Sequence, residues 1–191
     1  MRLLDRLLRR PSAPGWLGPL LEADEFVLAS ASVDPPASVD PPAASADLGA
    51  EPGAELPERM VVATSHGIWL PERRRIGWHL VSKATWAAGT LSLIEAVEEP
   101  LDGAVLLSDR PVRRLSLADP GKLPQTVQER VEGSIRSRHR RDLPGGGVWL
   151  VQRKLPGKGV VQLQVRADRG TDADAVRQVA AEVSRRIELD P

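Results

Sequence analysis

Five short segments with β-strand character follow one another between residues 59 and 118, and they limit the fold more than any other feature. They cover 59–70, 75–86, 90–98, 104–108 and 112–118, and β-branched and aromatic residues are frequent in the first two. Only short turn sequences such as PERRR and EPLDG separate them. Because strands that are close in sequence usually pair with one another, we expect an antiparallel β meander.

The hydrophobic pattern becomes helical after these strands. Apolar residues recur at every fourth position, at Leu123, Val127, Val131 and Ile135. This spacing places them on one side of a helix, which we expect to run over about 124–139.

The C-terminal part predicts two further strands and a helix. Residues 148–155 and 160–167 alternate as in a β-hairpin with one solvent-facing side, after a flexible break at 143–147. Residues 170–187 form the clearest helical pattern, and Thr171 is the expected N-cap. The fold class is therefore α+β, in which an antiparallel sheet with a helix precedes a C-terminal ββα element.

A Pro- and Ala-rich stretch interrupts the chain before the first of the five segments. The hexad ASVDPP occurs twice in tandem, at 31–36 and 37–42, and large apolar residues are nearly absent from 32–57. Such a segment cannot bury enough surface to offset the entropy lost on ordering. We therefore predict a disordered insertion at 32–57.

The chain accordingly divides into four parts. We expect an amphipathic N-terminal segment, a β domain with a C-terminal helix that the insertion interrupts, and a hairpin plus helix packed on the same domain. These parts cover 1–18, 19–31 with 58–142, 32–57 for the insertion, and 143–191.

The N-terminal segment carries leucines on one side of a short predicted helix, 2–10, and arginines on the other. A helix of this length is not stable alone in water, so something must order it. Docking on its own domain is the first interpretation. The second is weak peripheral contact with an anionic membrane or another partner. The residues that would make this contact are Leu3, Leu4, Leu7, Leu8 and Trp16.

The composition excludes several classes of protein. Lys and Arg together number 26, as do Asp and Glu, so no bulk attraction to nucleic acid is expected. Cysteine is absent, which excludes disulfides and thiolate metal sites. No apolar run approaches the length of about 18 residues that a membrane-spanning helix needs. We expect a cytoplasmic location, at most peripheral at the inner membrane face.

Two histidines raise the question of a metal site. His66 and His79 lie on neighbouring predicted strands, and in one register they would face each other. A shift by one residue instead collects large apolar residues on one face, each worth roughly 1.5–3 kcal/mol when buried. These residues are Ile68, Leu70, Ile76, Trp78 and Leu80. We expect the second register, and therefore no metal site and no cofactor.

Catalytic and nucleotide-binding motifs are missing from the sequence. Ser65 lacks the G-x-S-x-G context of a nucleophile elbow, and the glycines at 145–147 lack the Lys-Ser/Thr of a P-loop. We predict no catalytic residue, and expect a protein that is not an enzyme.

Arginines form two dense groups. They are Arg73, Arg74 and Arg75 in the first turn, and Arg136, Arg138, Arg140 and Arg141 at the expected end of the first helix. Cations stabilise a helix C-terminus, so a solvated basic surface is the first interpretation. Contact with an anionic partner is the second. Nucleic-acid binding through 136–141 is a further alternative, although no aromatic residues alternate with these arginines to stack bases.

The segment from Glu25 to His139 resembles bacterial pleckstrin-homology-like and GRAM-like domains. The similar features are the E-x-VL start at Glu25, the GIWL sequence at 67–70, the IGWHLVSKA segment at 76–84, and RRLSLAD before the striped helix. The overall residue usage also resembles that of an uncharacterised actinobacterial protein type. The resemblance implies a partly open PH-like barrel closed by a helix, and binding of lipids, peptides or proteins.

We therefore expect a non-enzymatic interaction or ligand-binding module with an unknown protein or lipid partner. One alternative is a small enzyme or ligand carrier with a pocket between sheet and helix. Another is nucleic-acid binding through the arginine group 136–141.

Overall fold

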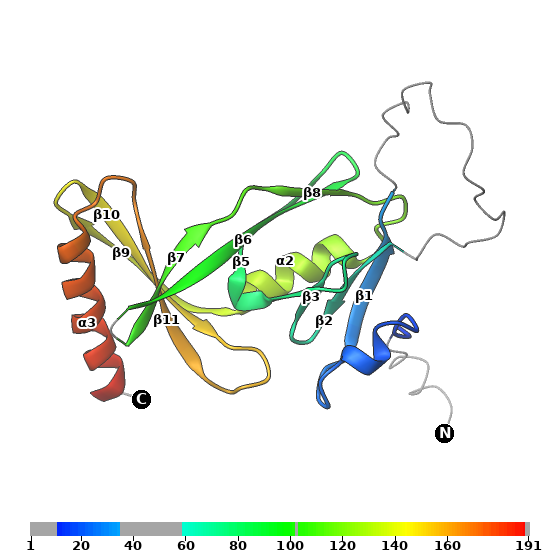
Figure 1. Ribbon diagram of the computed structural model, residues 1–191, viewed down its shortest axis with the longest axis horizontal. Helices are drawn as coiled ribbons and strands as arrows, with labels where there is room; N and C mark the ends of the chain where they lie inside the picture. Colours follow the sequence, from blue (N-terminus) through cyan, green and yellow to red (C-terminus); the bar gives the residue numbers. More distant parts are fainter. Residues whose placement is uncertain (1–10, 35–58, 102, 190–191) are drawn as a thin grey trace, which may run out of the picture.

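The computed structural model describes residues 11–34, 59–101 and 103–189, and for 187–189 the backbone only. The described residues form eleven strands, two α-helices and two short 3-10 helices, which confirms the predicted α+β class. They are arranged in two lobes with separate hydrophobic cores. One long strand, β6 (Thr90–Leu101), passes from the first lobe into the second (Figure 1).

The first sheet has four antiparallel strands in chain order. They are β1 (Val27–Ser32), β2 (Met60–Thr64), β3 (Gly67–Trp69) and β4 (Arg75–Gly77). Ser32 pairs with Met60, so the two ends of the Pro- and Ala-rich stretch meet. Val33 bridges to Leu117, which places the first residues of the predicted insertion in the folded part. The rest of that insertion, and the predicted N-terminal helix, lie outside the described residues.

The second sheet has seven strands and a mixed topology. Its order is β5 (Val81–Ala87), β6 (Thr90–Leu101), β7 (Ala104–Asp109), β11 (Val161–Ala167), β10 (Gly146–Lys154) and β9 (Ile135–Leu143), with β8 (Arg113–Ser116) beside β6. The pairing of β7 with β11 is parallel and the others are antiparallel. The expected meander is therefore right for the pairing of β3 with β4 and for β5, β6 and β7, but wrong for β8, which returns to β6.

Helix α2 (Leu123–Gly133) lies between β5 and the first sheet and fills the first core (Figure 1). Leu123 and Val127 are fully buried there, together with apolar residues from both sheets. The four-residue spacing of these side chains predicted this burial.

Helix α3 (Ala173–Leu189) covers one face of β7, β10 and β11 at the other end of the molecule (Figure 1). Its Val176, Val179 and Ala180 are buried against Val148 and Val165. The predicted C-terminal ββα element is confirmed by β10, β11 and α3. The helix is capped by Asp172, whose carboxylate accepts from the N–H of Ala175, and not by Thr171.

The single strand expected over 59–70 is instead a tight hairpin of β2 and β3. The Thr64 hydroxyl accepts from the backbone N–H groups of His66 and Gly67, and this local bonding favours a turn. Gly67 is required because a Cβ there would lie 2.3 Å from the carbonyl oxygen of Ile76. The next predicted strand is also interrupted, by η2 (Trp78–Leu80), which directs Trp78 into the core.

The register of β3 and β4 follows the apolar residues, as predicted. Ile68 pairs with Ile76, and Gly67 pairs with Gly77. His66 and His79 therefore do not face each other across the hairpin.

The predicted helix over 124–139 is wrong in its second half. Helix α2 ends at Gly133, and Ile135 begins β9, which pairs with β10 along its whole length. The arginines of this segment therefore belong to an edge strand and not to a helix C-terminus. The expected flexible break at 143–147 is the turn of the β9–β10 hairpin. Pairing with β10, which comes later in the chain, overrides the helical pattern, because that pattern has only one apolar residue beyond Val131.

Among the residues that the structure describes, no helix combines the length and the hydropathy needed to cross a membrane.

Candidate functional site

The two faces of the second sheet differ in what covers them. Helix α3 packs on the face that carries Val148, Leu150 and Val165. Because side chains alternate along a strand, Trp149, Val151 and Arg153 of β10 point to the opposite face. Helix α3 does not cover that face, and at Arg153 the face is covered by η2 (Trp78–Leu80) and by Ser134, the C-cap residue of α2.

A pocket of about 240 Å³ lies on the face that α3 leaves uncovered, beside η2. Three arginines line it from three different strands, namely Arg138 of β9, Arg153 of β10 and Arg166 of β11. Apolar walls come from Leu107, Ile135, Trp149 and Val151, and His79, Ser82 and Gln164 complete the lining. We call this cavity the basic pocket.

Arg153 is the most unusual residue of the basic pocket. Only 7% of it is exposed, and its Nη1 donates to the carbonyl oxygens of Trp78 and Val81 and to the Ser134 hydroxyl, at 3.1, 3.2 and 3.1 Å. All three acceptors are uncharged. Within the described residues no carboxylate lies within ion-pair distance of Arg153, unlike most of the arginines around it. Burial, and then the charge of Arg166, lower the pKa of the Arg153 guanidinium.

Arg166 is paired, in contrast. Its Nη1 lies 2.6 Å from a carboxylate oxygen of Asp109, and its Nη2 donates to the Ser82 hydroxyl at 2.6 Å. That hydroxyl donates in turn to the other oxygen of Asp109. Burial alone would raise the pKa of Asp109, but the bonds from Arg166 and Ser82 outweigh it and hold the pKa below its ordinary value. Asp109 therefore remains an anion and offsets one of the three arginine charges.

His79 adds no positive charge to the basic pocket. Burial, followed by the charges of Arg153 and Lys158, lowers its pKa from 6.5 to about 4. The imidazole is therefore neutral at physiological pH. Its backbone carbonyl accepts from Nε2 of Gln164, which is 1% exposed, so the end of η2 is bonded directly to β11.

Arg138 stands at the exposed side of the basic pocket. Its guanidinium carbon lies 5.4 Å from the centre of the Trp149 ring, and that of Arg140 lies 5.6 Å from the same ring. Arg140 also pairs with Asp168 at 2.7 Å, whereas no carboxylate among the described residues pairs with Arg138. Trp149 therefore provides an aromatic wall beside a cation that is not neutralised.

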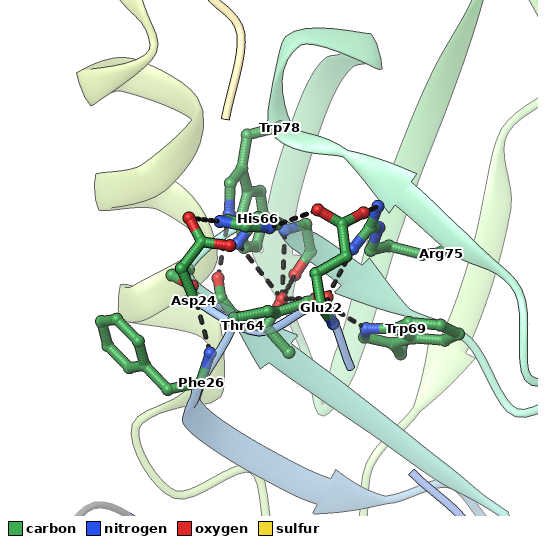
Figure 2. Close-up of polar contacts among 11 residues, drawn as sticks. Glu22, Asp24, Phe26, Thr64, His66, Trp69, Arg75 and Trp78 are labelled. Atoms are coloured by element: carbon green, nitrogen blue, oxygen red, sulfur yellow. Dashed lines mark hydrogen bonds and ion pairs between the residues drawn. The ribbon is translucent and has the colours of Figure 1, made fainter. Parts of the chain in front are cut away.

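A second cluster of charged residues lies just before β1 and is organised around Glu25. Figure 2 shows its members Glu22, Thr64 and Arg75 close together. The Glu25 side chain is fully buried and accepts from the Thr64 hydroxyl at 2.5 Å, from the Trp69 indole at 3.0 Å, and from Arg75. Arg75 also donates to Glu22. We call these residues, with Asp24 and His66, the Glu25 cluster.

His66 lies within the Glu25 cluster, between two carboxylates (Figure 2). Its Nδ1 is 3.2 Å from Glu22, without the geometry of a hydrogen bond, and its Nε2 is 3.3 Å from Asp24. Glu22, Glu25 and His66 are close enough together to hold a metal ion. However, the Arg75 guanidinium already binds both glutamates. The fold thus brings Glu22 and Asp24 close to His66, although both are distant from it in sequence. Arg75 pairs with two of the three carboxylates of the cluster.

The structure disperses the first predicted arginine group. Arg73 stacks on Trp16 at 5.7 Å, Arg74 forms a bidentate pair with Glu95, and Arg75 belongs to the Glu25 cluster. Trp16 is half-buried and packs edge-on against Trp69 at 6.4 Å. Leu3, Leu4, Leu7 and Leu8 lie outside the described residues.

Of the second predicted group, only Arg138 lines the basic pocket. Arg140 pairs with Asp168 and Arg141 with Glu182, while Arg136 is exposed on the same strand. Sequence reasoning missed Arg153 and Arg166. The alternation of 148–155 would have placed Arg153 on the same face as Trp149, but it could not show that this face is buried there.

Comparison of the chain with protein-family models, with curated proteins and with solved structures finds no match.

Proposed function

We propose that this protein is a non-enzymatic ligand-binding module that holds a small organic anion in the basic pocket. The observation that carries the proposal is Arg153, a buried guanidinium that faces the pocket with three uncharged acceptors and, among the residues that the structure describes, no carboxylate partner. Arg138 adds a second unpaired cation at the exposed side.

The unfavourable free energy of an isolated buried charge supports this proposal. Removing a cation from water is unfavourable by several kcal/mol unless an anion lies close to it. Hydrogen bonds to carbonyl oxygens recover only part of this loss. An anionic ligand would recover more, because the Coulomb attraction is stronger beside the partly buried Arg153 than at the surface.

The pocket favours binding over catalysis. Its histidine is a weak base with a pKa of about 4, and the Ser82 hydroxyl donates to Asp109 while it accepts from Arg166. The pocket lies between η2 and the strands β9, β10 and β11, on the face of the sheet that α3 does not cover.

The relation of the first lobe to PH-like and GRAM-like domains is part of this proposal. Its support is the curved arrangement of β1–β6 and β8 around α2, which is a partly open barrel with a helix inside its mouth (Figure 1). On that basis the rest of the second sheet, β7 and β9–β11, together with α3 is an addition that creates the basic pocket at the junction of the lobes. A cytoplasmic location, with or without peripheral membrane contact, belongs to the same proposal.

Thermal unfolding with small organic anions tests the proposed function. A ligand that binds only the folded state raises the melting temperature. We expect at least one of benzoate, benzenesulfonate and phenyl phosphate to raise it in the wild type but not in Arg153→Met. Arg169→Gln, which removes an arginine from the exposed turn before α3, is the matched control and should respond as the wild type does. No response to any of the three anions, or an equal response in Arg153→Met, would contradict the proposal.

A further inference from the structure

The number of uncompensated charges in the basic pocket indicates how many charges its ligand carries. Arg138, Arg153 and Arg166 line the pocket, and Asp109 is paired with Arg166. The described residues thus leave two positive charges without a partner, on Arg138 and Arg153. A monoanion would leave one of them unpaired, whereas a dianion matches both.

The remaining titratable groups near the pocket do not change this balance. His79 is neutral above a pH of about 4. Glu98 lies on the same face, 3.5 Å from Nε2 of Gln164, but it does not line the pocket and forms no ion pair with Arg138 or Arg153. Lys158 acts on His79 from outside the lining and adds positive charge, not negative.

The shape of the pocket indicates that the ligand also has an apolar part. Leu107, Val151 and Trp149 form walls that offer no charge to a bare ion. The volume of about 240 Å³ is more than a tetrahedral oxyanion needs. It is also below the range of about 300–1,000 Å³ that is usual for drug-sized ligands. A compact ligand with an anionic head near Arg153 and an aromatic or aliphatic body against Trp149 fits these limits.

We propose that the ligand of the basic pocket is a phosphate monoester with a compact apolar body, bound by Arg138 and Arg153. This inference rests on the proposed function and specifies the chemical class of its ligand. A phosphate monoester carries close to two negative charges at neutral pH, and its oxygens suit the planar fork of a guanidinium. A sulfonate or a carboxylate carries one charge and satisfies only one of the two arginines.

Isothermal titration of the full chain with matched probes tests this class. Phenyl phosphate and benzenesulfonate share the ring and the tetrahedral head, and differ in charge. We expect phenyl phosphate to bind at least tenfold more tightly than benzenesulfonate. Inorganic phosphate, which lacks the apolar body, should bind at least tenfold more weakly than phenyl phosphate.

Variants show whether the two named arginines cause this preference. Arg138→Gln changes an exposed residue and should fold normally, and it should reduce the preference for phenyl phosphate over benzenesulfonate to less than threefold. Arg153→Met should abolish the binding of both probes. Arg169→Gln should leave both affinities unchanged. A preference that persists in Arg138→Gln would contradict the assignment.

Vesicles distinguish a lipid headgroup from a free phosphate monoester. Phosphatidylcholine vesicles that contain phosphatidic acid present the same headgroup chemistry on a membrane. Co-sedimentation that phenyl phosphate competes away would identify the lipid as the source, and no co-sedimentation would identify a soluble ligand. Equal affinity for phenyl phosphate and benzenesulfonate would refute the dianion but leave the proposed function intact. Binding of neither probe would remove the support for both.

Discussion

Glu25 and Arg153 are both buried charged residues, but only Glu25 is surrounded by groups that complement its charge. The Glu25 carboxylate accepts from Arg75, Trp69 and Thr64, and Arg75 also binds Glu22. Within the described part of the chain, Arg153 donates to two backbone carbonyls and a hydroxyl and to no carboxylate. Glu25 therefore has a cationic partner inside the protein, whereas Arg153 has no anionic partner among the described residues.

The difference separates a structural role from a binding role. The Glu25 cluster joins the residues before β1 to β2, β3 and β4, and all of its strong contacts are within the protein (Figure 2). The basic pocket joins the two lobes through Arg153 and Gln164, but it leaves positive charge facing a cavity. The charges of a structural cluster are satisfied by the fold, and those of a binding site are completed by the ligand.

The largest effect is expected from breaking the Glu25 cluster. Glu25→Gln keeps the volume of the side chain but removes the negative charge to which Arg75 and the Trp69 indole donate hydrogen bonds. We expect the free energy of unfolding to fall by about 2–3 kcal/mol, because a partly buried cation loses its partner. Urea denaturation measures this change. Glu132→Gln on the exposed side of α2 is the control and should change it by less than about 0.5 kcal/mol. An unchanged midpoint for Glu25→Gln would show that the cluster does not stabilise the fold.

A smaller effect on stability is expected from Arg153→Met. The variant loses three hydrogen bonds to uncharged acceptors, but it also removes a cation whose burial is unfavourable. We expect the two contributions to offset, so that the free energy of unfolding in an anion-poor buffer changes by no more than about 1 kcal/mol. Lys154→Met, at the exposed neighbouring position, controls for the change in residue type. A loss as large as that in Glu25→Gln would mean that Arg153 is primarily structural.

A further prediction concerns the dependence of stability on pH. His79 has a folded-state pKa of about 4, below its ordinary value of 6.5. Between these values the unfolded chain binds a proton that the folded chain does not, so stability falls as the pH falls from about 6.5 to 4. His79→Gln removes this contribution, and its urea midpoint should fall less over that window. His139→Gln on the exposed edge strand should behave like the wild type. Identical pH profiles for His79→Gln and the wild type would contradict the neutral, buried His79.

The last prediction is that the Glu25 cluster takes up no metal ion. Arg75 occupies the position of a cation between Glu22 and Glu25, so the free protein should retain no stoichiometric zinc after purification. Elemental analysis of the wild type, His66→Ala and His79→Ala measures this. One zinc per chain that is lost in His66→Ala would show that metal displaces Arg75, and would remove the contrast with the basic pocket.

The sequence by itself determined the elements whose signals are local. The apolar alternation of 160–167 and the helical stripe of 170–187 correspond to β11 and α3. The register of β3 and β4 was also predictable, because a shift by one residue would have turned Ile68 and Ile76 to different faces. Both kinds of signal depend on neighbours within a few residues, so they do not need the rest of the fold.

Only the tertiary structure decided which strands pair over long distances. β9 has an arginine-rich sequence without a clear apolar period, and its conformation depends on pairing with β10. The hairpin of β2 and β3 depends on hydrogen bonds of Thr64 that a continuous β-like sequence does not reveal. The parallel pairing of β7 with β11 joins segments that no local pattern connects.

The same distinction applies to the candidate site. The sequence states that position 153 is a cation, and its alternation with Trp149 assigns it a face of β10. It does not state that this face is closed by Trp78 and Val81, which lie 75 and 72 residues away along the chain. The charge of a side chain is a property of the residue alone. Its desolvation and the absence of a counter-ion beside it are properties of everything that packs around it, and these exist only in the folded chain.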